Sequence, residues 1–163
     1  MLNKLFGLKR NRHSFMLYSH MSGELIPLRE VSDEVFSSGM LGDGIAIEPN
    51  SGKLYSPCSG IVEHIFDTHH AFNIMSDFGA EILLHIGIDT IKLKGKGFDV
   101  KVKEGDRVNK GDLICVFDTQ VIKSAGLKTT TPMVITNSGD YSKIEARPKC
   151  NISTGDSVLK IEK

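Results

Sequence analysis

The chain contains 163 residues, of which 40% are hydrophobic, with 20 basic and 20 acidic side chains and no tryptophan. This length and composition predict one globular domain and argue against a disordered or multidomain chain. A formal net charge of zero provides no basic field, so we expect neither DNA nor RNA as a partner. No apolar run approaches the roughly 20 residues that a membrane span needs.

The first part of the chain differs in charge from the rest. We expect residues 1–16 to form a flexible basic segment and residues 17–163 to form a single domain. The hydrophobic residues between positions 2 and 8 have helical spacing and lie among basic ones. This pattern is typical of a short amphipathic helix in peripheral contact with an anionic membrane, and a frayed tail is the alternative.

Short stretches rich in Val, Ile and Phe, separated by glycine-containing pairs such as SG, GD and GK, predict an all-β fold over the rest of the chain. The frame YSxxSG occurs at residues 18–23 and again at 55–60, and a Gly-Asp turn at 104–108 is echoed at 154–158. Such repeats indicate duplicated β-hairpin units. Helical signal is limited to residues 32–35, where Ser32 is a candidate cap, and to 119–125. We therefore predict an antiparallel β-sandwich or barrel with only short helical turns.

Three cysteines, Cys58, Cys115 and Cys150, form no CxxC pair. Their odd number favours a reducing compartment, hence a cytoplasmic protein, and argues against a structural zinc knuckle. Cys58 follows a proline in a predicted turn without an evident polar partner. We expect it to be a small buried thiol and not a nucleophile.

The most informative strand covers residues 81–88. Its even positions, Ile82, Leu84, Ile86 and Ile88, are all apolar and are expected to face the core. His85 then points outward beside Leu83, with Asp89 at the end of the strand. Gly87 is expected to leave room for a large group to reach the imidazole. A plain surface histidine is the alternative.

A second cluster lies at residues 68–72, where Thr68 and His70 share one face of an extended chain. Histidine titrates near pH 6.5, so a neutral ring has one nitrogen free to attack while the other donates a hydrogen bond. Two such rings side by side suit phosphoryl transfer, or zinc binding together with a carboxylate. The sequence alone does not show that His70 and His85 are neighbours. The remaining histidines, at positions 13, 20, 64 and 69, are expected at the surface.

These motifs resemble a known family. Residues 68–72 (THHAF), 84–90 (LHIGIDT) and 93–98 (LKGKGF), with shorter matches at 42–44, 104–108 and 131–132, are similar to the glucose-family enzyme IIA (EIIA) of the phosphoenolpyruvate:sugar phosphotransferase system. The resemblance covers residues 17–163. It implies a β-sandwich of the duplicated hybrid type with a shallow active site on one sheet face.

The resemblance also implies residue roles. His85 matches the phosphoryl acceptor, which attacks through Nε2, His70 matches the second active-site histidine, and Thr68 matches the threonine that orients it. The phosphoryl group would come from the phosphohistidine of the carrier HPr and leave to a cysteine on the IIB domain of a membrane sugar permease. Both partners would dock on one patch; its expected residues are Val35, Phe36, Phe66, Leu83 and Asp89. For Phe36 and Phe66 a core position is an equally good interpretation.

The sequence argues against two other functions and is compatible with a third. A lysostaphin-type zinc peptidase needs an HxH pair, which is lacking, and a biotinyl or lipoyl carrier needs a hairpin lysine in an EAMKM-like motif, also lacking. A regulatory protein of the same fold, whose histidine phosphorylation state controls its partners, is compatible with the transfer role. No cofactor is required for transfer; in the regulatory case His70 and His85 could hold zinc together with a carboxylate of the partner.

Overall fold

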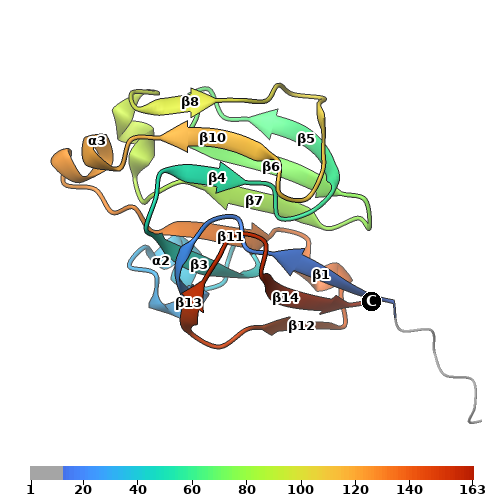
Figure 1. Ribbon diagram of the computed structural model, residues 1–163. Helices are drawn as coiled ribbons and strands as arrows, with labels where there is room; N and C mark the ends of the chain where they lie inside the picture. The colour runs from blue at the N-terminus through green and yellow to red at the C-terminus, as the bar shows by residue number, and fades with distance from the viewer. Residues whose placement is uncertain (1–12) are drawn as a thin grey trace, which may run out of the picture.

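The structure is a computed structural model that describes residues 13–163. It is built from antiparallel strands with a few short helices (Figure 1). The strands are β1 (Ser14–Tyr18), β2 (Gly23–Pro27), β3 (Asp43–Pro49), β4 (Lys53–Tyr55), β5 (Gly60–Ile65), β6 (Ala71–Ser76), β7 (Glu81–His85), β8 (Phe98–Val100), β9 (Arg107–Val108), β10 (Leu113–Phe117), β11 (Thr131–Ile135), β12 (Lys143–Ala146), β13 (Cys150–Ile152) and β14 (Ser157–Glu162). The helices are α2 (Glu34–Ser37), α3 (Thr119–Ser124) and the 3-10 turns η1 (Leu28–Glu30), η2 (Thr90–Leu93) and η3 (Ser138–Asp140).

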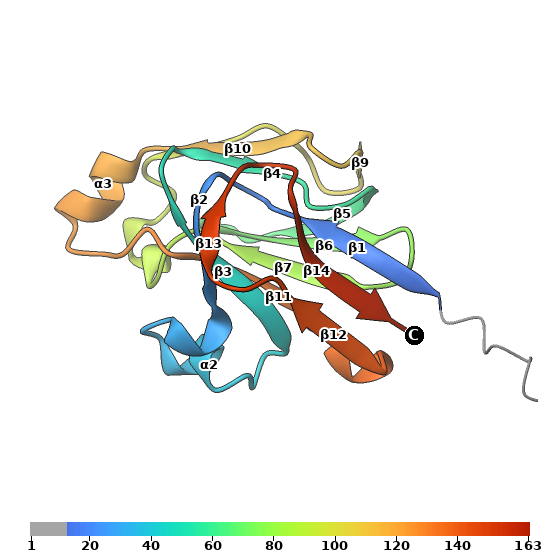
Figure 2. The ribbon, with the colours of Figure 1, turned by 60° about the horizontal axis from the view of Figure 1, so that its bottom comes forward.

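The strands form one large sheet and two small ones. The large sheet has eight strands in the order β13-β2-β3-β11-β7-β6-β5-β9, and the three-stranded sheets have the orders β4-β10-β8 and β1-β14-β12. Figure 2 shows the two small sheets beside the curved large sheet, with α2 beyond β3. The arrangement confirms the predicted all-β sandwich, and no sheet of the described residues closes into a barrel.

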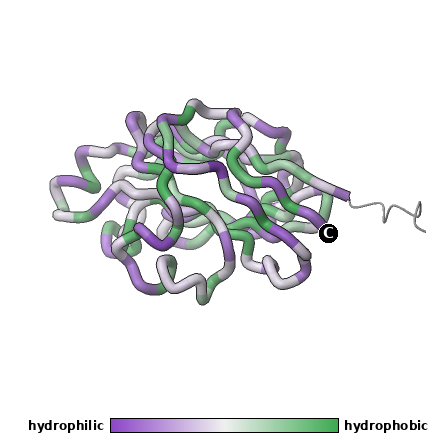
Figure 3. The backbone as a smooth tube through the Cα atoms, turned by 90° about the horizontal axis from the view of Figure 1, so that it is seen from below, coloured by the Kyte–Doolittle hydropathy of each residue, from purple (hydrophilic) through white to green (hydrophobic). Residues whose placement is uncertain are grey.

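Two apolar clusters lie on opposite faces of the large sheet. Side chains alternate between them along the central strands: on β7, Ile82 and Leu84 join the main cluster and Leu83 joins the second, and on β2, Leu25 and Ile26 divide in the same way. Figure 3 shows the hydrophobic colouring concentrated along the strands and the hydrophilic colouring at peripheral turns. Because both faces are covered, the central strands carry nearly continuous apolar runs.

The second cluster corrects two expectations for residues 81–88. Leu83 shares a face with His85 as expected, but it is only 9% exposed, because Phe36 and other residues of η1 and α2 belong to the cluster that covers this face. Ile88 also belongs to the second cluster and not to the main core. The regular strand ends at His85, so the alternation that placed Ile88 does not extend that far.

The YSxxSG repeat is confirmed by reciprocal backbone hydrogen bonds. The amide of Tyr18 donates to the carbonyl of Pro57 at 3.0 Å, and the amide of Tyr55 donates to the carbonyl of His20 at 2.8 Å. The Ser19 and Ser56 hydroxyls each donate to a carbonyl two residues further on, at 2.6 and 2.7 Å. The two copies are therefore hydrogen-bonded to each other with approximate two-fold symmetry.

The second predicted echo pairs differently. The amide of Ser19 donates to the carbonyl of Asp156, and the amide of Ser56 donates to that of Asp112. The counterpart of the turn at 154–158 is therefore the turn that contains Asp112, and not the turn at 104–108, which bonds to Val62. All three turns contain Gly-Asp, which is why the sequence comparison selected the wrong one.

The ends of the predicted elements differ in detail. Helix α3 lies within the predicted 119–125 segment, whereas α2 is capped by Asp33, whose side chain accepts from the amide of Val35, and not by Ser32. Residues 14–16, which we assigned to the N-terminal segment, belong to β1 and pair with β14. The predicted amphipathic helix lies outside the described residues. Within residues 13–163 no helix is long and apolar enough to cross a membrane.

The burial of Leu83 makes a stability prediction. Replacing Leu83 with Asp places an unpaired carboxylate inside the second cluster and should lower the free energy of unfolding by about 3 kcal/mol or more. The matched control is Ile91→Asp, because Ile91 is 57% exposed and should tolerate the change. Urea denaturation of both variants measures the difference; equal stabilities would show that Leu83 is not part of a packed cluster.

Candidate active site

The two candidate histidines meet at the edge where β6 begins and β7 ends. Ala71, the first residue of β6, pairs with His85, the last residue of β7. The amide of Ile86 donates to the carbonyl of His70 at 2.7 Å, which extends this pairing by one residue. The rings of His70 and His85 lie edge to face with centroids 4.8 Å apart. The structure thus brings together the two residues whose adjacency the sequence left open.

A single hydrogen bond defines the tautomer of His85. Its Nδ1 lies 2.7 Å from the carbonyl oxygen of Gly87. A carbonyl can only accept, so Nδ1 must carry the proton. In the neutral ring, Nε2 is then unprotonated and keeps its lone pair. The hydrogen bond therefore leaves Nε2 as the basic nitrogen of the His85 ring.

The role of Gly87 differs from the expected one. Its φ of 71° lies in the left-handed region, which favours glycine. A Cβ atom here would lie 2.5 Å from the Thr90 methyl group and 2.8 Å from the Lys128 carbonyl oxygen. Glycine is thus required to form the turn that aims the carbonyl at His85, and not to leave open space beside the imidazole. The spacing H-x-G was the available signal, but the sequence does not report the direction of a carbonyl.

His70 is held by Thr68, as the shared face predicted. The Thr68 hydroxyl lies 2.6 Å from Nδ1 of His70. The His70 side chain is buried. This burial, followed by the adjacent His85, lowers the pKa of His70 to about 4, against the opposing effect of a hydrogen bond with the Thr68 backbone. At neutral pH the ring is uncharged.

Burial also lowers the pKa of His85. The hydrogen bond to Gly87 and the negative charges of Asp33 and Asp89 oppose this shift. Asp33 was missed by the sequence analysis, because its distance from His85 depends on how α2 packs. Both rings are neutral near pH 7, which is the state a nucleophilic imidazole needs.

Aromatic rings flank the histidine pair on both sides. Phe36 lies edge-on to His85 at 5.1 Å between centroids, and Phe66 lies edge-on to His70 at 5.8 Å. Phe36 is 5% exposed and Phe66 is half-buried, so each combines packing with a position beside the site. They restrict the rotation of the two imidazoles.

The other predicted docking residues differ in exposure. Val35 is 43% exposed, and Asp89 is exposed at the start of η2 with a left-handed φ of 59°. Leu83, by contrast, is buried within the second cluster and offers almost no surface. Met40 and Ile91, 73% and 57% exposed, were not predicted; both are apolar side chains on the segments that carry Val35 and Asp89.

Two further sequence expectations concern residues away from the pair. Cys58 is buried as predicted, and burial, followed by the charge of Asp77, raises the pKa of its thiol to about 12. The expectation that His20 lies at the surface is wrong, because its side chain is fully buried. The other three histidines at positions 13, 64 and 69 are exposed as expected.

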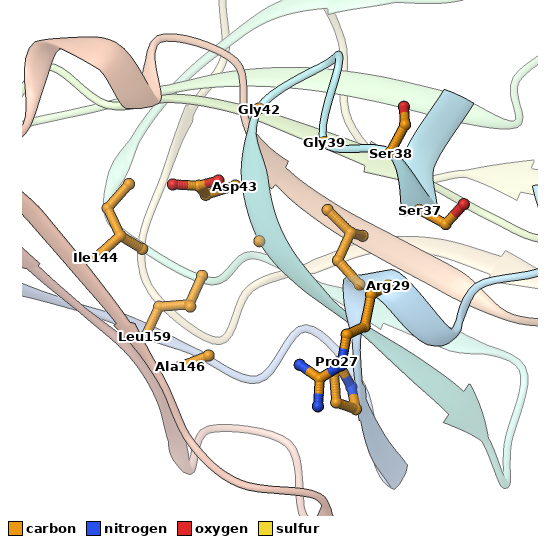
Figure 4. Close-up of a pocket in the computed structure, with 12 residues that line it drawn as sticks. Pro27, Arg29, Ser37, Ser38, Gly39, Gly42, Asp43, Ile144, Ala146 and Leu159 are labelled. Atoms are coloured by element: carbon orange, nitrogen blue, oxygen red, sulfur yellow. The ribbon is translucent and has the colours of Figure 1, made fainter. Parts of the chain in front are cut away.

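A separate cavity of about 380 Å³ lies between β3 and the β12–β14 pair. Figure 4 shows Arg29 and Asp43 at this cavity together with the apolar side chains of Ile144 and Leu159. It contains neither histidine. Among residues 13–163 no group of three His, Cys, Asp or Glu side chains is arranged to hold a metal ion. The histidine pair is therefore the best candidate for chemistry.

Comparisons with known proteins identify the family. Residues 15–141 match the family described as phosphoenolpyruvate-dependent sugar phosphotransferase system, EIIA 1. The chain belongs to this EIIA family. The family description thus confirms the resemblance to an EIIA component of the sugar phosphotransferase system. A solved structure, the glucose permease IIA from Mycoplasma capricolum, is 37% identical and has a TM-score of 0.85 over 91% of this chain and 96% of that one.

Curated relatives are larger proteins. The β-glucoside-specific EIIBCA component of Halalkalibacterium halodurans is 48% identical over 143 residues, which are 88% of this chain and 22% of that protein. The components of the same name from Dickeya chrysanthemi and Bacillus subtilis are 49% and 50% identical, over 79% and 78% of this chain and 20% and 21% of those proteins. The EIIA chain thus spans about a fifth of the length of the curated relatives it matches.

The lowered pKa values of His20 and His70 predict that the protein loses stability at acidic pH. Burial lowers the pKa of both His20 and His70 to about 4, whereas unfolded histidine titrates near 6.5. The unfolded chain binds more protons between these values, so the free energy of unfolding should fall as the pH falls from about 6.5 towards 4. Urea denaturation at several pH values measures the slope. His20→Gln is the matched control and should flatten it; a slope unchanged in this variant would contradict the assignment.

Proposed function

We propose that the chain accepts a phosphoryl group on Nε2 of His85 from the phosphohistidine of HPr and passes it to a cysteine of a IIB domain. The observation that carries this proposal is the hydrogen bond between Nδ1 of His85 and the Gly87 carbonyl. It leaves Nε2 as the one basic nitrogen of the ring. The β-glucoside-specific names of the relatives support a IIB domain of a β-glucoside permease as the recipient.

The first transfer balances without a change in protonation of His85. The Nε2 lone pair attacks phosphorus, a P–N bond forms, and the P–N bond to the donor imidazole breaks with its electrons returning to the donor nitrogen. Nδ1 keeps its proton throughout and shares the positive charge of the phosphorylated ring with the Gly87 carbonyl. Since this acceptor is already in place, the step needs little reorganisation.

The second transfer depends on His70. The thiolate of the IIB cysteine attacks phosphorus, and the electrons of the breaking bond return to Nε2 of His85. We propose that the Thr68 hydroxyl donates to Nδ1 of His70. The Nε2–H of that ring is then available to the phosphoryl oxygens, on which charge is spread during transfer. The neutral state of His70 suits this role, because a neutral donor does not trap the phosphoryl group as an ion pair would.

Docking of both partners is proposed on the apolar surface around the pair, which we define as Val35, Met40, Phe66 and Ile91, with Asp89 at its edge. Phe36 is 5% exposed and packs beneath this surface. Val35, Met40 and Ile91 are substantially exposed, and an exposed apolar patch rimmed by polar residues marks a protein interaction site. Leu83 supports this surface from below and contributes no area of its own.

A regulatory role is the second candidate. Phosphorylation adds about −1.5 to −2 charges in the middle of an apolar surface, which would repel some partners and attract others. For zinc, the pair offers two imidazoles, fewer than the four ligands of a tetrahedral site. We propose that any zinc at this pair would require a carboxylate of the partner.

Histidine variants test the division of labour. His85→Gln should abolish labelling by phospho-HPr, because glutamine lacks the nucleophilic nitrogen. His70→Gln should still be labelled at His85, but transfer to a IIB cysteine should fall by about 10²-fold or more. Labelling with ³²P-phosphoenolpyruvate, enzyme I and HPr, followed by a chase with IIB, measures both steps. Labelling of His85→Gln would contradict the role of His85 as acceptor. Undiminished phosphoryl transfer from His70→Gln to IIB would contradict the role of His70.

A surface variant tests docking. Val35→Asp introduces a charge that would be desolvated against an apolar partner, and should raise the Kd for HPr about tenfold or more without unfolding the protein. Met16→Asp is the control, because Met16 is 37% exposed but lies on β1 in a different sheet. Titration of labelled HPr measures both affinities. Equal Kd values for the two variants would place the partner surface elsewhere.

A further inference from the structure

His20 is a buried polar residue without an assigned role. It lies between β1 and β2, and its side chain has no exposed surface. Its Nε2 lies 2.9 Å from the carbonyl oxygen of Thr131, so Nε2 must carry the proton and donate. The Nδ1 atom then has a bare lone pair, and no partner lies within reach among the described residues. Leaving a buried acceptor unpaired costs stability.

The repeated frame of the fold does not require this imidazole. In the second copy of the YSxxSG frame, Pro57 occupies the place of His20. The reciprocal bonds to Tyr18 and Tyr55 use only the carbonyls of these two residues. The imidazole of His20 is therefore not needed to form the repeat, and a role for it must be sought elsewhere in the structure.

A chain of hydrogen bonds joins His20 to the active site. Thr131, the first residue of β11, accepts from His20 through its carbonyl. Its hydroxyl donates to the Thr129 carbonyl at 2.9 Å and accepts from the amide of Gly87 at 3.4 Å. The Gly87 carbonyl in turn accepts from Nδ1 of His85.

The protonation state of His20 favours a fixed hydrogen bond to Thr131, which we call the His20 strut. Complete burial lowers its pKa to about 4, partly opposed by the bond to Thr131. At neutral pH the ring is uncharged and has a single donor, which points at Thr131. The direction of this bond is thus constant while His85 gains and loses its phosphoryl group.

We propose that His20 is a positioning residue for phosphoryl transfer, which fixes Thr131 and, through the Thr131 hydroxyl, the Gly87 turn that holds His85. The proposal rests on the proposed function in which His85 is the phosphoryl acceptor. It extends that site to the main core, beyond the residues that touch the histidine pair.

Three single variants test the strut. His20→Phe keeps a ring of similar size but removes the donor, His20→Gln keeps an N–H near the position of Nε2, and Thr131→Val removes the hydroxyl at nearly constant volume. His20→Phe and Thr131→Val should each slow phosphorylation of His85 by phospho-HPr, by about 2- to 30-fold, and His20→Gln should recover most of the loss. The double variant His20→Phe/Thr131→Val should be no slower than the slower single variant.

A spectroscopic measurement separates positioning from general destabilisation. Long-range ¹H–¹⁵N NMR spectra of the unphosphorylated proteins should show a mixture of the two neutral His85 tautomers in His20→Phe and Thr131→Val, and one tautomer in the wild type and in His20→Gln. An unchanged His85 tautomer and rate in Thr131→Val, or in a folded His20→Phe, would overturn the proposal. Thr131→Val decides alone if His20→Phe does not fold. Absence of phosphorylation in the wild type would instead overturn the proposed function, while the tautomer comparison would still test the strut.

Discussion

The bond between Nδ1 of His85 and the Gly87 carbonyl is the constraint on which the proposed phosphoryl transfer depends. A neutral imidazole has one donor and one acceptor nitrogen, and the protein must choose which of them faces the partner. The choice is made here by a backbone carbonyl at 2.7 Å. A main-chain acceptor does not titrate, so the selection persists across the pH range in which the ring is neutral.

The fold holds that carbonyl in place from several directions. Gly87 takes a left-handed conformation that a side chain would prevent, the amide of Ile88 donates to the Lys128 carbonyl at 3.0 Å, and the Thr90 hydroxyl donates to the Ile86 carbonyl. Pairing of Ala71 with His85 then brings His70 alongside. The second cluster buries the face of β7 next to His85, so the histidine pair is supported by packed side chains. Val35 and Ile91 remain exposed and apolar.

The sequence predicted what depends on local pattern. Alternation in β7 placed His85 and Leu83 on one face, and the motif T-x-H predicted the contact between Thr68 and His70, because both follow from the two-residue period of an extended chain. Alternation reports which residues share a side but not what covers that side. The burial of Leu83 under Phe36, and the proximity of Asp33 to His85, arise from the packing of α2, which is distant in sequence from β7. The turn at Gly87 and the buried His20 likewise depend on tertiary contacts with Lys128 and Thr131.

The tautomer of His85 in the unphosphorylated protein tests the central claim most directly. Long-range ¹H–¹⁵N NMR spectra of the wild-type chain near pH 7.5 distinguish a protonated from an unprotonated ring nitrogen through their different ¹⁵N shifts. The structure predicts one neutral form of His85, with the proton on Nδ1 and Nε2 bare. A ring protonated on Nε2 would contradict the account, because the lone pair would then point at Gly87 and away from the incoming phosphoryl group.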